Sequence, residues 1–321
     1  MRGIMSTTHT DSHQESMSLE DLKKMEESIN SDKKLRWGLD HNRLFPPLGR
    51  LKNASITKKD EHYYLEADYQ CYEKQKDIEW DNSLVMETFQ DPYSFIEVEK
   101  EHNSELMISV DPNSFRNITS YQSFWDEVRV QNYPTIATEH RRKASLAIPE
   151  IIYTLGPSAL IYQILKPVAK RVGDKLGDAV ADKIIDQGKI FYNYISKTML
   201  SAFRHGAEAN QQMLVIFQLT GIPNVELIAK TKDHDLIMKA LKNKKLESLK
   251  NEIEFYQSKF NLEKIQFVLN EKGKWKFNYL LTSEGSAIGK KETFRKRDQR
   301  YSILLKNSNG EIYNSIGITG R

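Results

Sequence analysis

Residue types and spacings that support known chemistry occur in this sequence only as near matches. The chain has no Gly-x-x-x-x-Gly-Lys-Ser/Thr run to bind phosphates and no His-Glu-x-x-His pair to bind zinc. Asp91, Glu97 and Lys100 approach the spaced acids and lysine of a metal-dependent nuclease, but Val98 stands where a carboxylate is needed. We interpret this near match as a solvated strand face.

Two further candidates have simpler interpretations. In Asp233-His234-Asp235, sequence neighbours point apart on a helix, and Asp233 is explained as an N-cap. Cys71 is the only cysteine, which excludes an intramolecular disulfide, and alternation places it on the apolar face of a strand as a small buried hydrophobe. We therefore predict no catalytic residue, metal ligand or cofactor. Enzymatic activity stays open, because catalytic residues far apart in sequence leave no local motif.

A basic stretch near the C-terminus is the first feature that suggests binding. Its cations attract phosphate, and the interleaved rings of Phe294 and Tyr301 could stack on bases. We interpret the stretch as a solvated loop between strands, with a polyanion site as the alternative. The candidate polyanion-binding residues are Lys290, Lys291, Arg295, Lys296, Arg297 and Arg300.

A ridge of small residues is the second such feature. Ala169, Gly173, Gly177 and Ala181 recur every four residues, beside an apolar helical stripe between Pro157 and Ala202. Glycine in a helix interior costs roughly 1 kcal/mol relative to alanine, so two on one ridge indicate close approach of another backbone. The predicted partner-binding residues are Ala169, Gly173, Gly177, Ala181, Val172 and Leu176.

The apolar stretch from Ala147 to Leu165 raises the alternative of a membrane-active effector. It is flanked by cations and carries Glu150 as its only charge. Pro149 and the Gly156-Pro157 pair interrupt it, and such stretches are more often buried helix and turn than bilayer spans. We expect the soluble alternative.

Composition agrees with a folded, cytoplasmic protein. The 321 residues include 39% apolar and 10% aromatic residues, enough to build hydrophobic cores. A net charge of +3, from 47 basic and 44 acidic residues, is too small for the whole surface to attract polyanions. The polar first residues lack the apolar core of a secretory signal.

Hydrophobic periodicity predicts the elements that position these residues. A helix over 19–29, capped by Ser18, lies in an otherwise polar tail. Strands are expected over 62–72, 84–88, 94–98, 106–110, 213–219, 225–230, 264–269, 275–281 and 301–305. Helices are expected from Asp111-Pro112, over 157–203 and from Asp233.

These elements predict an α+β protein in four segments. They are a polar tail with a short helix (1–44), an antiparallel β-rich domain (45–140), a central helical segment (141–209) and a C-terminal β-β-α-β-β domain (210–321). We expect a non-enzymatic adaptor or assembly subunit, in the setting of a bacterial defence or toxin system. It would act through helix-mediated self-association or partner docking. A nucleic-acid-binding accessory protein is a further alternative.

Overall fold

The structure, a computed structural model, describes residues 2–10, 16–39, 42–95, 106–130, 136–140, 148–156, 181–206, 212–307 and 316–317. The chain forms two compact units, Met1–Val98 with Leu281–Arg321, and Glu99–Leu280. Both contain helices and antiparallel strand pairs, which confirms the α+β class. The four segments predicted from the sequence have other boundaries than these two units. That division of the chain stays a prediction.

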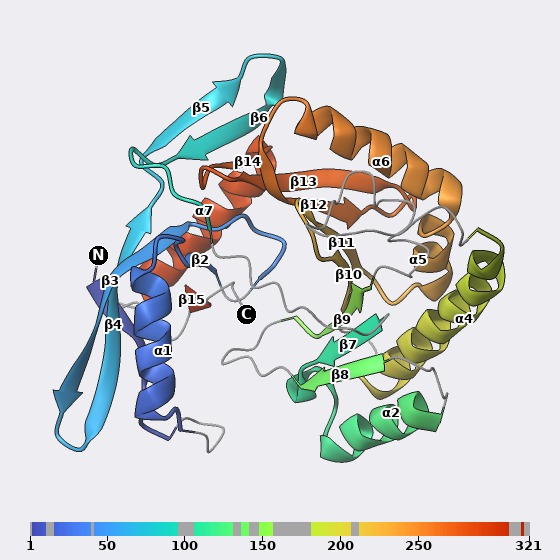
Figure 1. Ribbon diagram of the computed structural model, residues 1–321, viewed down its shortest axis with the longest axis horizontal. Helices are drawn as coiled ribbons and strands as arrows, with labels where there is room; N and C mark the ends of the chain where they lie inside the picture. Colours follow the sequence, from blue (N-terminus) through green and yellow to red (C-terminus); the bar gives the residue numbers. More distant parts are fainter. Residues whose placement is uncertain are drawn as a thin grey trace. The chain divides into compact units, whose positions relative to one another are not determined.

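The first unit contains a five-stranded sheet covered by helix α1 (Leu19–Asn30). Leu22 and Ile29 of the helix are fully buried, and Trp37 and Leu51 of the sheet belong to the same core. Figure 1 shows α1 in blue beside the two longest strands. The strand order is β1 (Arg2–Thr7), β4 (His62–Cys71), β3 (Gly49–Lys59), β2 (Arg36–Leu39) and β15 (Ile316–Gly317).

The start of the chain is more ordered than its polar sequence predicts. The helix and its Ser18 cap are confirmed, because the Ser18 side chain accepts a hydrogen bond from the Asp21 backbone amide. The sequence predicts no strand in the polar tail, but residues 2–7 form β1 and pair antiparallel with β4. The two apolar residues of this strand, Ile4 and Met5, are adjacent in sequence, so the strand lacks the alternation that predicts a half-buried strand.

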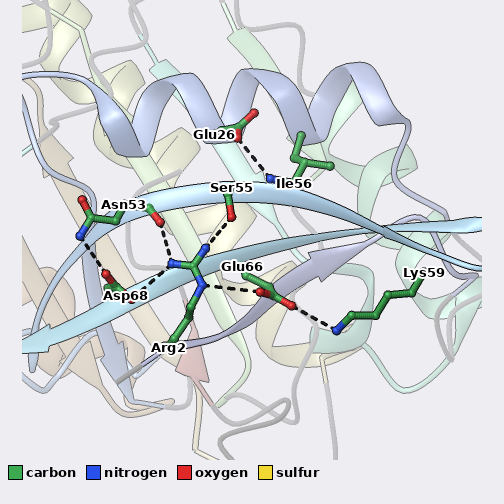
Figure 2. Close-up of polar contacts among 8 residues, drawn as sticks. All are labelled: Arg2, Glu26, Asn53, Ser55, Ile56, Lys59, Glu66 and Asp68. Carbon is green, nitrogen blue, oxygen red and sulfur yellow. Dashed lines mark hydrogen bonds and ion pairs between the residues drawn. The ribbon is translucent and has the colours of Figure 1, made fainter.

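Arg2 ties β1 to its neighbours through side-chain contacts, which Figure 2 shows. Its guanidinium donates to the Asn53 carbonyl oxygen (2.9 Å) and pairs with Asp68 (3.3 Å) and Glu66 (3.5 Å). It also hydrogen-bonds the Ser55 hydroxyl. These side-chain contacts add to the backbone pairing that holds β1 against β4.

The first unit also contains a smaller antiparallel arrangement followed by a helix. Strand β5 (Lys74–Ile78) pairs with β6 (Asp81–Thr88), and β6 pairs with β14 (Ala287–Lys290). Helix α7 (Lys291–Asn307) follows β14 without a break. The sequence predicts a loop and then a strand over 301–305 here, and both expectations are wrong.

The second unit contains seven strands of a mixed sheet. Three neighbouring pairs are parallel and alternate with antiparallel pairs: β7 with β8, β9 with β10, and β11 with β12. The strand order is β8 (Ile136–His140), β7 (Leu106–Val110), β9 (Glu150–Leu155), β10 (Leu214–Leu219), β11 (Asn224–Lys230), β12 (Leu262–Leu269) and β13 (Trp275–Thr282). The helical elements are η1 (Pro112–Ser114), α2 (Ile118–Val130), α4 (Ala181–His205), α5 (His234–Ala240) and α6 (Asn243–Gln257).

One face of this sheet is apolar and covered by helices. Register places Tyr153, Phe217, Leu227 and Phe267 side by side across four strands, and all four are fully buried. The Tyr153 hydroxyl hydrogen-bonds Thr198 of α4 (3.0 Å). Trp275 on β13 donates from its indole nitrogen to the carbonyl of Ala240 at the end of α5 (3.0 Å). The helix-facing side of the sheet is therefore the main core of this unit.

Alternation places a polar row on the opposite face of the same strands. Thr154, Gln218, Glu226 and Gln266 are register neighbours. Glu226 is fully buried and lies 3.1 Å from the Lys264 ammonium nitrogen. Gln266 donates to Glu226 (2.6 Å) and accepts from Asn278 (2.7 Å). Hydrogen bonds within the row offset part of the desolvation cost of a buried charge.

Three helical expectations need correction or completion. Helical spacing predicts that Ile118, Tyr121, Trp125 and Val128 face the sheet; the last three are buried in α2, but Ile118 is 63% exposed. The described part of the apolar stretch 147–165 forms strand β9, so a buried helix there is wrong. Of the helix expected over 157–203, the described part is α4, from residue 181 onward. Within the described residues, no helix is long and apolar enough to cross a membrane.

Candidate binding groove

Helix α7 carries five of the six residues of the basic stretch, and its two sides have different roles. Phe294 and Arg297 lie on the inner side and are 1% and 3% exposed. Lys291 and Arg295 lie on the outer side, one helical turn apart, and are exposed. The sixth residue, Lys290, ends β14. The stretch is therefore an amphipathic helix rather than a loop.

The inner side anchors α7 through Arg297. Its guanidinium donates to the Glu87 carboxylate of β6 at 2.9 and 2.8 Å, and to the Pro47 carbonyl oxygen at 2.8 Å. Asp298 accepts a further hydrogen bond at 2.8 Å, and the Phe294 ring lies 4.8 Å from the guanidinium carbon. Burial raises the pKa of Glu87, although the hydrogen bonds from Arg297 oppose that rise. Arg297 is therefore a structural residue, and its assignment to a polyanion site is corrected.

The outer side of α7 forms one wall of a groove, and the β5–β6 hairpin forms the other. We call this the α7 groove; its volume is ≈ 910 Å³. An ion pair between Lys291 and Asp77 joins the two walls at 2.9 Å. The lining residues are Gln75, Lys76, Asp77, Val85, Lys291, Arg295, Asp298, Gln299, Ser302, Ile303 and Lys306.

Charge in the α7 groove is mainly positive. Asp77 pairs with Lys291, and Asp298 pairs with Arg297, its neighbour on the same helix. Lys76, Arg295 and Lys306 are exposed and form no ion pair with any residue that the structure describes. The groove thus presents three exposed cations that form no direct ion pair with a described residue, although Arg295 also attracts the nearby Glu292.

The other residues of the basic stretch do not line the α7 groove. Lys296 pairs with Glu292 one turn away at 2.7 Å, and that contact lowers the pKa of Glu292. Neither Lys290 nor Arg300 is among the lining residues. Tyr301 packs against Trp37 with ring centroids 6.0 Å apart. Of the six predicted cations, the structure brings Lys291 and Arg295 together at the groove.

The sequence missed Lys76 and Lys306, which complete the groove. Lys76 comes from a hairpin more than two hundred positions away, and local spacing cannot show that two distant segments form opposite walls. Lys306 could have been found: it follows Lys291, Arg295 and Ser302 at helical spacing along one face. The expectation of a strand over 301–305 concealed that periodicity.

The ridge that predicts self-association falls mainly outside the described residues. This applies to Ala169, Val172, Gly173, Leu176 and Gly177. Ala181 is the first residue of α4, and the structure does not describe its side chain. Helix-mediated self-association through this ridge stays a prediction.

The near matches to catalytic and metal sites resolve in different ways. Asp233 caps α5 by accepting from the Leu236 amide at 2.9 Å, as predicted. His234 hydrogen-bonds Ser196 at 2.8 Å. Asp91 accepts a hydrogen bond from Arg50 through its backbone carbonyl, while residues 97 and 100 lie outside the described residues. In the part of the chain that the structure describes, no three His, Cys, Asp or Glu side chains are grouped to hold a metal ion.

Cys71 differs from its prediction. Leu65, Ala67 and Tyr69 form the buried face of β4 as expected, but Cys71 at the end of the strand is exposed. Partial burial of the thiol raises the pKa of Cys71, although the charge of Arg297 and a hydrogen bond with Tyr301 oppose that rise. A raised thiol pKa disfavours the thiolate, the reactive form of a cysteine nucleophile.

Comparisons with known proteins assign no family to the chain: no family model, no curated protein and no solved structure matches it.

Proposed function

We propose that this protein is a non-enzymatic adaptor or assembly subunit that docks a protein partner in the α7 groove. One observation carries the proposal: Lys76, Arg295 and Lys306 line an open groove without ion-pair partners among the described residues. Three like charges held on rigid elements repel one another and favour an acidic partner. Electrostatic complementarity of this kind directs association and specificity.

The lining residues favour a protein over a nucleic acid. Ile303 is 50% exposed in the groove, and it offers a contact to an apolar side chain. The rings expected to stack on bases are engaged elsewhere, since Phe294 is buried and Tyr301 packs on Trp37.

The test compares two variants of equal net charge. One carries Lys76→Glu, Arg295→Glu and Lys306→Glu, which reverse the groove. The control carries Lys23→Glu, Lys33→Glu and Lys244→Glu, at exposed cations that do not line the groove. Proteins retained from a lysate of the source organism are identified, purified separately and mixed with each variant. The mass of the complex is then measured by light scattering.

The proposal expects a purified partner that forms a complex with the wild type and with the control, but not with the groove variant. If both variants bind that partner equally well, or if no purified protein forms a complex with the wild type, the adaptor role of the groove is wrong. Salt-resistant retention of nucleic acid by the wild type and not by the groove variant would instead favour the nucleic-acid alternative.

A further inference from the structure

We infer that Ser196 is a nucleophilic serine, activated by His234 and Asp235, that accepts an acyl group from a thioester or an activated ester. This inference goes beyond the proposed function, because the three residues lie in the second unit and the α7 groove lies in the first. It follows from a chain of hydrogen bonds, from the direction of those bonds, and from the helices that hold the side chains in place.

The three side chains form one hydrogen-bonded chain. The Ser196 hydroxyl of α4 lies 2.8 Å from Nε2 of His234, the first residue of α5. Nδ1 of His234 lies 3.1 Å from Oδ1 of Asp235. Sequence neighbours on a helix usually point apart, but here the carboxylate contacts the imidazole of its neighbour. A hydroxyl on one imidazole nitrogen and a carboxylate on the other is the arrangement that activates a serine nucleophile.

The carboxylate fixes the direction of both hydrogen bonds. The Asp235 carboxylate only accepts, so Nδ1 of His234 carries the hydrogen and donates it. In the neutral imidazole Nε2 is then an acceptor, and the Ser196 hydroxyl donates to it. The imidazole is therefore placed to take the hydroxyl proton, which is the step that makes a serine nucleophilic.

The Ser196 hydroxyl differs from other hydroxyls on the helices of this protein. Thr198 of α4 and Ser302 of α7 each donate to a backbone carbonyl one turn earlier, which is a common bond of a helical hydroxyl. Within the described residues, the side chain of Ser196 hydrogen-bonds to His234 alone. Its hydrogen is thus committed to a base rather than to the backbone.

Contacts between α4 and α5, which lie side by side in Figure 1, hold the hydroxyl and the imidazole together. Tyr192, one turn before Ser196, donates to the Leu241 carbonyl at the end of α5 (2.7 Å). Asp233 caps the start of α5, next to His234. The His234 side chain is 21% exposed and Ser196 is half-buried, so an acyl donor can reach the hydroxyl. A nucleophile and base held on packed helices need little reorganisation before they react.

The inferred step is acyl transfer to the serine. Oγ of Ser196 attacks the carbonyl carbon of the donor, Nε2 of His234 takes the hydroxyl proton, and a carbon–oxygen bond forms. The bond from that carbon to the thiol sulfur or alcohol oxygen of the donor breaks, and the leaving group takes the proton from His234. The product is an ester on Ser196. Asp235 does not touch the donor and is a positioning residue.

The experiment treats the full chain with p-nitrophenyl acetate. Absorbance measures the released p-nitrophenolate, and mass spectrometry of peptides locates the acetyl group. Ser196→Ala removes the nucleophile, His234→Gln removes the base, and Asp235→Asn and Asp235→Glu test the positioning role. The matched control is Ser258→Ala, at an exposed serine whose hydroxyl donates to the Phe255 carbonyl. Circular dichroism checks that each variant is folded.

The inference expects one acetyl group on the Ser196 peptide of the wild type and of the Ser258 control. His234→Gln should slow this acetylation at least about tenfold, because the general base is lost. Asp235→Asn should also slow it, and Asp235→Glu should restore part of the rate. If the Ser196 peptide stays unmodified, or reacts as fast in His234→Gln as in the wild type, the inference is wrong and the contact only joins α4 to α5.

Continued release of p-nitrophenolate beyond one equivalent, abolished by Ser196→Ala, would support the same nucleophile with hydrolysis as a second step. It would contradict the non-enzymatic part of the proposed function. Partner docking in the α7 groove has its own test with the purified partner, so the two proposals fail separately.

Discussion

The guanidinium of Arg297 and the carboxylate of Glu87 form a two-point ion pair, with nitrogen–oxygen distances of 2.9 and 2.8 Å. Both side chains are buried, and the pair joins α7 to β6. The sequence alone predicts Arg297 as a phosphate-binding residue like the cations beside it. The structure holds its side chain inside the protein instead. The same helix presents Arg295, two positions earlier, to the α7 groove.

Removing one partner of this ion pair should be strongly destabilising. We expect Arg297→Ala to lower the free energy of unfolding by about 3–5 kcal/mol, because the Glu87 carboxylate is left buried without its partner. Lys296→Ala, its exposed neighbour, should change that free energy by less than about 1 kcal/mol. Chemical denaturation of both variants checks this, and equal effects would contradict an anchoring role for Arg297.

A second expectation concerns acid stability in the first unit. Hydrogen bonds from Asn53 and Arg2 lower the pKa of Asp68. A carboxyl group with a lowered folded-state pKa stabilises the protein above its unfolded pKa of about 3.9, and this contribution is lost as the pH falls through the folded-state value. Asp68→Asn should therefore destabilise the protein near neutral pH and have a progressively smaller effect below about pH 4.

Asn53→Gly provides a matched variant for this measurement. Asn53 has a φ of 52°, so glycine removes the side-chain donor without adding backbone strain. Urea unfolding across the acid range should show that Asn53→Gly reduces the pH dependence of stability relative to the wild type. An unchanged pH dependence in both variants would exclude Asp68 as its source.

Two glycines with positive φ should respond differently to substitution by asparagine, which tolerates left-handed backbone. At Gly285 (φ 78°), an added Cβ would overlap the backbone carbonyl of Tyr93. At Gly273 (φ 65°), it would meet only the Leu236 side chain at 3.1 Å, which can move. We expect Gly285→Asn to cost more than about 1 kcal/mol and Gly273→Asn less, measured by thermal unfolding.

The sequence predicts those elements whose hydrophobic pattern lies within the element itself, and misses those that depend on residues far away in the chain. Alternation or apolar runs predicted β4, β10, β11, β12 and β13 closely, because those strands bury continuous apolar faces. The strand β1 and the helix α7 were missed. The pairing of β1 depends on Arg2 contacting residues more than fifty positions away, and α7 buries Arg297 where an apolar residue would have shown the helical period.

The candidate site was predicted in part for the same reason. Lys291 and Arg295 could be identified because they are close in sequence. The sequence does not show that Arg297, which is equally close, is buried while the other two are exposed. The buried Glu226, Lys264 and Gln266 in the second unit were also missed. Glu226 lies on β11, while Lys264 and Gln266 lie on β12, and only the strand register brings them together.

Cys71 should react slowly with alkylating reagents despite its exposure. Partial burial raises the pKa of the thiol, which lowers the thiolate fraction at neutral pH. We expect slower alkylation by iodoacetamide than of a small-molecule thiol such as glutathione near neutral pH, and acceleration as the pH rises. Alkylation as fast as that of glutathione would show that the thiol is not desolvated.

The buried pair of Glu226 and Lys264 gives a test of the polar row. Glu226 is fully buried and lies 3.1 Å from the Lys264 ammonium nitrogen. Removing one charge leaves the other without compensation, so Glu226→Leu alone should lower the free energy of unfolding by about 3–5 kcal/mol. Replacing both, with Glu226→Leu and Lys264→Met, should recover much of that loss, because apolar residues of similar volume need no compensating charge. If the double variant loses as much free energy of unfolding as the two single variants combined, the two charges are not energetically coupled. Each would then stabilise the protein through separate contacts.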